Sequence, residues 1–300
     1  MITVHKKVCK SNYYPTIKKQ KHEFSLLSID SGLSYITYYM VKPFRENISN
    51  DIPIIIISDK TDEYSFYLDK ILEDFNNIQI YIKDIYQTLS WSAQHSFYLQ
   101  YGIDNYINTE NLIICDNDVI FLKPTEFYDF RKMLDNFMTD NYYKIYEYMF
   151  YMSQYILYYL NGIPMSKEYL VFNDYKIDHI EYNKYICKYK NYNCTYYDRI
   201  DPYICLLKTE IFKNNDIKIF NTKNKELDFI FNKELYIDTF GKFTYDVLKY
   251  NIPINTQCEI NKFVYHLCGS SGSNIKSIIN YEKAAQHFMN SDPWNSKYFE

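Results

Sequence analysis

The sequence predicts an α/β fold in which helices flank a mostly parallel β-sheet. Short apolar runs such as Ile52–Ser58 (IPIIIIS) are rich in β-branched residues and lack polar alternation, which is typical of strands buried on both faces. Amphipathic segments of about 10 to 15 residues separate these runs. This alternation of strands and helices indicates βαβ units with right-handed crossovers, and therefore parallel strands.

The first part of the chain supplies the strands and helices of this sheet, which together predict a Rossmann-like half. The element after Ile52–Ser58 illustrates the helices, because its apolar residues fall on one helical face. In chain order we predict the strand Phe24–Asp30, the helix Ser31–Glu46, the strand Ile52–Ser58, the helix Asp62–Phe75, the strand Ile78–Ile82, the helix Ser90–Tyr101, and the strands Leu112–Cys115 and Val119–Leu122.

The rest of the chain changes character. Residues 127–197 are very rich in tyrosine and contain no glycine besides Gly162, and we predict a helical insertion there, with a buried helix at Met149–Leu160. Strands are expected to return afterwards, at Tyr203–Lys208, Phe229–Tyr236, Phe243–Tyr250 and Lys262–Leu267. We expect a basic N-terminal segment over residues 1–23 and a single domain over residues 24–300.

Composition excludes several classes of protein. The net charge of −4 argues against a nucleic-acid partner bound by broad phosphate neutralisation. Six glycines and eight prolines exclude collagen-like and low-complexity linker sequences. The seven cysteines are odd in number, form no Cys-x-x-Cys and follow no signal peptide, so a soluble protein of the reducing cytoplasm is expected. No apolar stretch reaches the ~18 residues of a transmembrane segment.

Polar residues follow several of the predicted strands. Asp30, Ser58, Asp59, Asp116 and Asp118 all lie where a strand ends. In parallel sheets ligands bind beyond the carboxyl ends of the strands, so these side chains are expected to face one crevice. Asp30 is equally suited to capping the helix that follows it, and Asp59 lies just before the start of another helix.

The triplet Asp116-Asn117-Asp118 is the sharpest feature. Two carboxylates directly after a buried strand need partners, because an unpaired buried charge is too costly. A hard divalent cation such as Mg²⁺ or Mn²⁺ meets that need and would also bridge to phosphate oxygens. The alternative is a solvated turn rich in Asp and Asn.

The surrounding residues resemble the GT-A superfamily of nucleotide-sugar-dependent glycosyltransferases. The run LIICDNDVIFLKP is similar to the strand that carries the Asp-x-Asp motif of that fold. Upstream, the helix start Trp91–Gln94 (WSAQ) is similar to the helix that precedes this motif in several such families, although no Arg or Lys lies between Ser92 and Leu99. Downstream, Tyr265–Gly269 (YHLCG) resembles the His-x-x-Gly element of the glycogenin/galactosyltransferase-like branch.

This resemblance implies a metal site and a diphosphate site. Asp116 and Asp118 would bind Mn²⁺ (or Mg²⁺) and the nucleotide diphosphate, and His266 would complete the metal site. The backbone after it, at Gly269 and Ser270, would support the diphosphate. From the residues alone, a histidine at a strand end is equally explained by a hydrogen bond, and the Gly/Ser-rich run 269–274 equally by a flexible loop.

The resemblance also suggests nucleotide contacts and a catalytic base. Asp30 and Asp59 would contact the base and ribose of the donor. An inverting enzyme needs a carboxylate to deprotonate the acceptor hydroxyl. Asp238, in ELYIDTFGKF, resembles the acidic position on the acceptor side of inverting GT-A enzymes, and Asp201 in RIDPY is the reserve candidate. Either residue is also suited to capping a helix.

The predicted function is a metal-dependent glycosyltransferase that moves a sugar from a nucleotide-diphosphate donor, first a UDP-sugar, to a glycan or other hydroxyl acceptor. Residues 24–125 would form the donor-binding half, 126–272 the acceptor half and 273–300 a C-terminal segment. One alternative is a haloacid-dehalogenase-like phosphatase, although three βα units precede the Asp-x-Asp here. A nucleotidylyltransferase would need a more Gly-rich loop than SIDSGLS. The non-enzymatic alternative is an inactive GT-A scaffold that acts as an interaction protein.

Overall fold

A computed structural model describes a large part of the chain, including the strands of a central sheet. The described residues are 4–5, 23–30, 34–58, 66–83, 91–139, 145–147, 156–160, 163–166, 176–181, 184–189, 192–198, 200, 202–214, 217–220, 239–240, 243, 246–247, 250–256 and 262–266.

The predicted α/β fold is confirmed. Four parallel strands form its centre: β2 (Phe24–Asp30), β3 (Ile54–Ser58), β4 (Ile78–Lys83) and β5 (Asn111–Cys115). They belong to an eight-stranded sheet of order β1-β4-β3-β2-β5-β13-β7-β14. The sheet is mixed because β13 pairs antiparallel with β5 and β1 pairs antiparallel with β4. The added strands are β1 (Val4–His5), β13 (Ile204–Lys208), β7 (Ile145–Glu147) and β14 (Ile254–Thr256).

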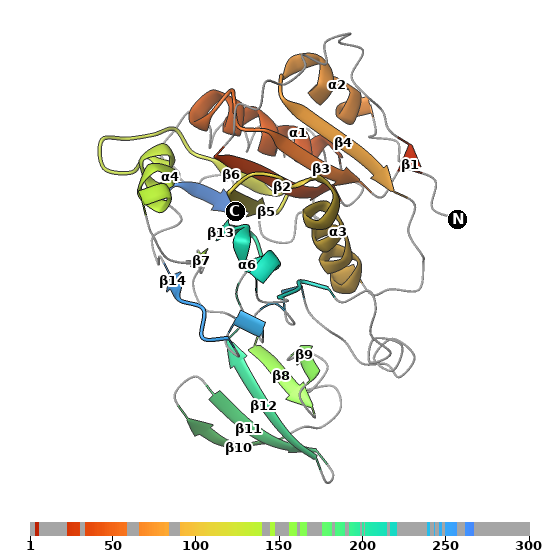
Figure 1. Ribbon diagram of the computed structural model, residues 1–300, viewed down its shortest axis with the longest axis vertical. Helices are drawn as coiled ribbons and strands as arrows, with labels where there is room; N and C mark the ends of the chain where they lie inside the picture. The colour runs from red at the N-terminus through yellow and green to blue at the C-terminus, as the bar shows by residue number, and fades with distance from the viewer. Residues whose placement is uncertain are drawn as a thin grey trace, which may run out of the picture.

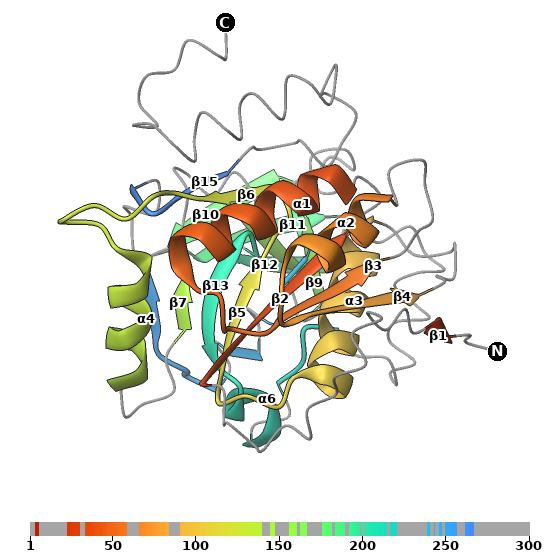
Figure 2. The same cartoon turned by 90° about the horizontal axis from the view of Figure 1, so that it is seen from above.

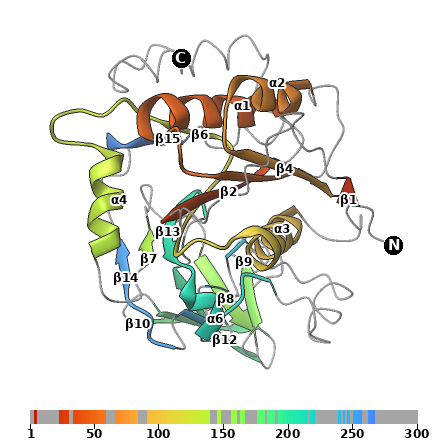
Figure 3. The same cartoon turned by 45° about the horizontal axis from the view of Figure 1, so that its top comes forward.

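Helices cover both faces of this sheet (Figures 1 and 3). On one face lie α1 (Ser34–Pro43), which continues into the π-helical turn η1 (Phe44–Ile48), and α2 (Phe66–Asp74) and α4 (Phe130–Thr139). On the other face lie α3 (Trp91–Tyr106) and α6 (Glu210–Asn214). The three helices predicted in the first half are confirmed, with bounds shifted by a few residues.

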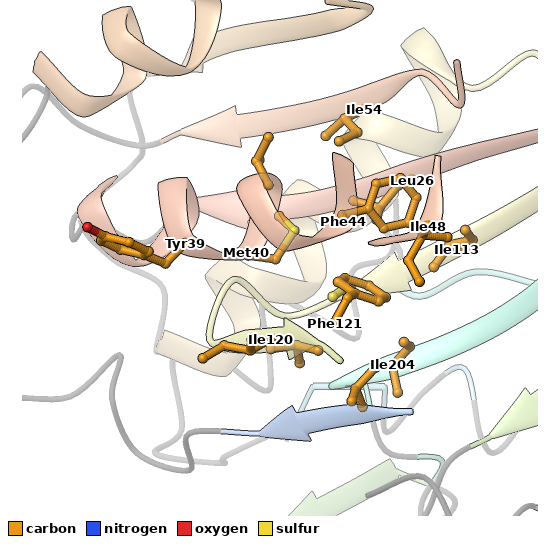
Figure 4. Close-up of a cluster of buried hydrophobic side chains, with 14 of the residues drawn as sticks. Leu26, Tyr39, Met40, Phe44, Ile48, Ile54, Ile113, Ile120, Phe121 and Ile204 are labelled. Carbon is orange, nitrogen blue, oxygen red and sulfur yellow. The ribbon is translucent and has the colours of Figure 1, made fainter. Parts of the chain in front are cut away.

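Two hydrophobic cores follow from the alternation of side chains along each strand. Leu26, Ile113 and Ile204 point toward α1, where they join Phe44 and Phe121 (Figure 4). The rings of Phe44 and Phe121 meet edge to face at 4.9 Å. The neighbouring residues of the same strands, among them Leu27 and Ile114, pack against α3 instead. Both faces of the sheet are therefore apolar, as the uninterrupted β-branched runs predicted.

The prediction of a helical, tyrosine-rich insertion was wrong for most of the described part of residues 127–197. After α4, the described residues form strands, and five of these build a separate antiparallel sheet of order β10-β11-β12-β8-β9, which lies away from α1 and α2 (Figure 1). Its strands are β8 (Ile156–Leu160), β9 (Ile163–Ser166), β10 (Lys176–Glu181), β11 (Lys184–Tyr189) and β12 (Tyr192–Asp198).

The physical reason is that tyrosine, isoleucine and threonine favour strands. The proposed helix Met149–Leu160 is contradicted where it overlaps β8. A signal for the correct reading was present: two residues, Asn161-Gly162, separate the paired residues Leu160 and Ile163, and Asn-Gly is the strongest short hairpin signal.

The predictions for the last part of the chain had mixed outcomes. The strand Lys262–Leu267 is confirmed as β15 (Val264–His266), which pairs antiparallel with β6 (Val119–Phe121). The predicted strand Phe243–Tyr250 was wrong, since Phe243, Asp246 and Val247 are helical. The buried Phe243 and Val247 lie four positions apart, which is a helical spacing. Phe229–Tyr236 lies outside the described residues.

Among the described residues, no helix is long and apolar enough to span a membrane.

Candidate metal and donor site

The carboxyl ends of the parallel strands gather the polar residues that the sequence singled out. Asp30 ends β2, Ser58 ends β3 and pairs with it in register, and Asp116 directly follows β5. The main-chain N–H of Asp116 donates to the carbonyl of Tyr203 at 2.9 Å, which joins the turn after β5 to the start of β13. The acidic turn is therefore fixed at the edge where ligands of parallel sheets bind.

His266 reaches this turn through the pairing of two short strands. In the β6–β15 ladder, Val119 lies opposite His266, and Figure 2 shows both strands beside α1. Asp118 immediately precedes β6, so its Oδ1 lies 3.1 Å from Nε2 of His266, a residue 148 positions away. Asp118 is 4% exposed. A buried carboxylate requires such a partner.

The ring of Tyr203 packs against the face of the His266 imidazole. The two rings are stacked, with centroids 4.6 Å apart and an interplanar angle of 8°. Tyr203 is itself buried at 1% exposure and is tied to the acidic turn through its carbonyl. Ring stacking and the β6–β15 ladder together restrict His266 to an orientation toward Asp118.

Asp116, Asp118 and His266 fit a single divalent cation. Each offers one ligand atom, and these atoms all lie within 4.8 Å of one another. Ligands on opposite sides of one Mg²⁺ lie about 4.2 Å apart, so side-chain shifts of under about 1 Å would bring all three onto one ion. Carboxylate oxygens suit Mg²⁺ and Mn²⁺, and a neutral imidazole nitrogen is a common ligand of transition-metal ions.

His95 was missed in the sequence and also belongs to this site. Its Nε2 lies 3.5 Å from Oδ1 of Asp116, and its side chain is 24% exposed. Helix α3 can pack closely on β2 because Gly102 has no Cβ: an added one would lie 2.7 Å from Leu27 Cδ1. The available signal was the position of His95, directly after the run Trp91–Gln94 in a helix that lacks Arg and Lys at that point.

Asp30 occupies the buried side of the same edge. It is 0% exposed, and its carboxylate accepts hydrogen bonds from Ser34 (3.0 Å), Thr37 (2.6 Å) and Ser58 (2.7 Å). A ligand would reach this carboxylate only if one of these hydroxyls moved. The expected contact of Asp30 with the base or ribose of a donor therefore stays a prediction.

Cys115 lies between the core and the acidic turn. Its Sγ donates to the carbonyl of Asp116 at 3.1 Å. Burial, and then the charges of Asp116 and Asp118, raise the pKa of this thiol well above its ordinary value. Cys115 is therefore a neutral thiol at pH 7, so it supplies no thiolate as nucleophile or metal ligand.

The other predicted site residues, Asp59, Asp201, Asp238, Gly269 and Ser270, lie outside the described residues.

Comparison with known proteins gives matches in structure alone. No protein family and no curated protein sequence matches the chain. Among solved structures, a TarS fragment from S. aureus has a TM-score of 0.47 at 10% identity, with 90% of this chain and 67% of that chain covered. The mannosyltransferase PcManGT from Pyrobaculum calidifontis, solved with GDP-Man and Mn²⁺, has a TM-score of 0.45 at 9% identity and coverages of 79% and 55%.

A third similar structure is a Bacillus anthracis protein described as a glucose-1-phosphate thymidylyltransferase. Its TM-score is 0.47 at 12% identity, with 91% of this chain and 99% of that chain covered. The chain spans 67% of the TarS fragment and 55% of the mannosyltransferase PcManGT. By their descriptions, the second of these proteins is a mannosyltransferase and the third a nucleotidyltransferase.

Proposed function

We propose that this chain is a metal-dependent glycosyltransferase that moves a sugar from a nucleotide-diphosphate donor, first a UDP-sugar, to a hydroxyl of a glycan or other acceptor. The observation that carries the proposal is the convergence of Asp116, Asp118 and His266 at the carboxyl edge of the sheet. In the sequence, these three residues lie in the two segments that resemble the Asp-x-Asp and His-x-x-Gly elements of GT-A enzymes.

The chain's own residues would divide the work at this site. Asp116, Asp118 and His266 would hold Mn²⁺ or Mg²⁺, and Tyr203 would keep the imidazole oriented. When bound, such a cation neutralises charge on the departing diphosphate. His95, beside Asp116 and partly exposed, is assigned to the donor phosphates, in place of the Arg or Lys that this helix lacks.

The remaining assignments extend this proposal to the rest of the donor and to the acceptor. Asp30 and Asp59 would contact the base and ribose, and the backbone at Gly269 and Ser270 would support the diphosphate. Asp238, with Asp201 as the reserve, would accept the proton of the attacking hydroxyl if the reaction inverts the anomeric centre.

A donor-hydrolysis screen tests the proposed function. Purified protein would be incubated with Mn²⁺ and UDP-, GDP- and CMP-sugars, and released nucleotide would be measured. Asp118→Ala is the site variant, and Asp135→Ala, on the exposed surface of α4, is the matched control. We expect release from one donor, lost in Asp118→Ala and kept in Asp135→Ala.

The same screen separates the alternatives. A haloacid-dehalogenase-like phosphatase would release inorganic phosphate from a generic phosphomonoester and would lose that activity in Asp116→Asn. An inactive scaffold would release nothing, and its melting temperature would not respond to Mn²⁺ with a nucleoside diphosphate. A ligand present at a hundred times its Kd stabilises the folded state by about 2.7 kcal/mol, which a thermal melt detects.

A further inference from the structure

We propose that Thr37 and Asn117 are positioning residues that couple the acidic turn to the buried carboxylate of Asp30 and thereby set the affinity of the site for Mn²⁺. The proposal rests on the metal site of the proposed function. It goes beyond that function because it assigns a role to the middle residue of the Asp-x-Asp turn and to a threonine of α1.

A continuous chain of hydrogen-bonded, buried side chains joins the acidic turn to Asp30. Nδ2 of Asn117 donates to Oγ1 of Thr37 at 3.1 Å, and Oγ1 of Thr37 donates to Oδ1 of Asp30 at 2.6 Å. Asp30 and Thr37 are both 0% exposed, and Asn117 is 4% exposed. These three residues, hereafter the relay, connect the end of β2, the middle of α1 and the turn after β5.

The chemistry of these side chains determines the direction of each hydrogen bond in the relay. A threonine hydroxyl has one proton and two lone pairs. The proton of Thr37 is directed to Oδ1 of Asp30, so a lone pair of Thr37 faces the turn. Only a donor suits that position, and this fixes the side-chain amide of Asn117 with its NH₂ group toward Thr37. The short distance of 2.6 Å to Oδ1 of Asp30 and the burial of both side chains hold Thr37 in this orientation.

The relay affects the metal site through the position of Asn117 in the acidic turn. Asn117 lies between Asp116 and Asp118 in the chain, so anchoring its side chain restrains the backbone on which both carboxylates are carried. A solvated Asp/Asn-rich turn would instead expose its amide to water. Groups that orient metal ligands without touching the metal typically change affinity by 10- to 100-fold when they are removed.

Ser58 provides a matched control for this proposal. Its hydroxyl also donates to Asp30, at 2.7 Å to Oδ2, and it is 0% exposed. Ser58 is not one of the three residues of the relay. Removing the Ser58 hydroxyl therefore perturbs Asp30 to a similar degree without cutting the connection through Thr37 to Asn117.

The test is a Mn²⁺ titration followed by the electron paramagnetic resonance signal of free Mn²⁺, which needs no donor sugar and no activity. We expect Thr37→Val to raise the Kd for Mn²⁺ about tenfold or more. Thr37→Ser keeps the hydroxyl and should stay within about twofold of wild type, and so should Ser58→Ala. Asn117→Ala cuts the relay at its other end and should match Thr37→Val, which covers the case that Thr37→Val does not fold.

The outcomes separate this proposal from the proposed function. If wild type binds Mn²⁺ and both Thr37→Val and Asn117→Ala bind it equally well, the relay is overturned and the metal site stands. An equal loss of affinity in Ser58→Ala and Thr37→Val would also overturn it, because any disturbance of Asp30 would then suffice. If the wild-type protein binds no Mn²⁺, the metal-dependent function fails and the relay has no site to position.

Discussion

The two ends of the parallel strands carry buried hydroxyl and amide side chains of the same kinds, which differ in their acceptors. Main-chain carbonyls predominate at the amino ends, where Thr109 also donates to Oγ of Ser25 at 2.9 Å. At the amino ends, Thr209 Oγ1 lies 2.6 Å from the carbonyl of Thr109 and 3.0 Å from that of Glu110. The side-chain amide of Asn111 donates to the carbonyl of Glu23 at 2.9 Å. At the carboxyl ends, Ser34, Thr37 and Ser58 donate to side-chain oxygens of Asp30 instead.

The ionisable members of the two ends follow the same division. Arg45, 4% exposed, donates to the main-chain carbonyls of Ser49, Ile52 and Asn77 near the starts of β3 and β4. Asp30 accepts from three hydroxyls and, through Thr37, is connected to a turn that carries metal ligands. Hydrogen bonds to main-chain carbonyls stabilise the fold, whereas hydrogen bonds to a side chain such as that of Asp30 can also affect the binding of a ligand near that side chain. We therefore expect substitutions at the amino end to change stability alone, and substitutions in the relay at the carboxyl end to change stability and Mn²⁺ affinity together.

The largest effect is expected at the carboxyl end, for Asp30→Leu. Leucine is the larger side chain and leaves three buried hydroxyls without their acceptor, at about 1 kcal/mol each, so the free energy of unfolding should fall by at least about 3 kcal/mol. The Kd for Mn²⁺ should rise as well. Asp30→Asn keeps an acceptor for Thr37 and should cost about 1 kcal/mol or less. Urea denaturation at constant m-value measures both; equal losses for Leu and Asn would contradict this account.

Arg45→Met is the corresponding experiment at the amino end. It removes three hydrogen bonds to carbonyls but also removes the cost of burying a charge, so we expect a loss of about 2 kcal/mol in the free energy of unfolding. Burial lowers the pKa of Arg45 to about 10, so the guanidinium is still charged at pH 7. The Kd for Mn²⁺ should not change. A weaker Mn²⁺ affinity in this variant would remove the distinction between the two ends.

Two threonine substitutions make the comparison at equal chemistry. Thr209→Val and Thr37→Val each remove one buried hydroxyl, and each should lower the free energy of unfolding by about 1.5 kcal/mol. Only Thr37→Val should also weaken Mn²⁺ binding, by about tenfold. The measurement pairs a urea unfolding curve with a Mn²⁺ titration for each variant, and Thr209→Ser and Thr37→Ser serve as controls that keep the hydroxyl.

The parallel half of the fold was predictable because its strands are buried on both faces. Only uninterrupted apolar runs such as Ile54–Ser58 satisfy two cores at once, so their pattern has one interpretation. The tyrosine-rich segment offered no such constraint. A tyrosine side chain has an apolar ring and a polar hydroxyl, so a tyrosine-rich segment fits both the helical and the strand spacing of apolar residues. The hairpin signal Asn161-Gly162 was therefore given too little weight.

The site was predictable to a similar, partial degree. Asp116 and Asp118 follow from the rule that strand ends bind ligands, and the resemblance to GT-A enzymes added His266. The relay was not predictable, because the sequence of a turn rich in Asp and Asn does not show whether its asparagine is buried or exposed to solvent. Its partner Thr37 lies 80 positions earlier on a helix whose residues also suit an ordinary core contact. His95 was missed for the same reason: only the packing of α3 on β2 places it beside Asp116.

The smallest expected effect comes from a carboxylate that is bonded like Asp30 but half exposed. Tyr38 donates to Oδ2 of Asp74 at 2.7 Å, and the side chain of Asp74 is 34% exposed. The hydrogen bond from Tyr38, and then that from Lys70, lowers the pKa of Asp74 below its ordinary 3.8. Because the folded-state pKa is lowered, this stabilisation is present above pH ~4 and is lost as the pH falls through the folded-state value.

Tyr38→Phe should therefore lower the free energy of unfolding by about 1 kcal/mol at pH 7, since solvent weakens a half-exposed bond to a charged group. The difference from wild type should shrink as the pH falls from about 4 through the lowered pKa that Asp74 has in the wild-type protein. Urea unfolding curves at pH 7 and pH 3 measure the two values. A difference that stays constant over this range would show that the contribution of the Tyr38 hydroxyl does not depend on the charge of Asp74.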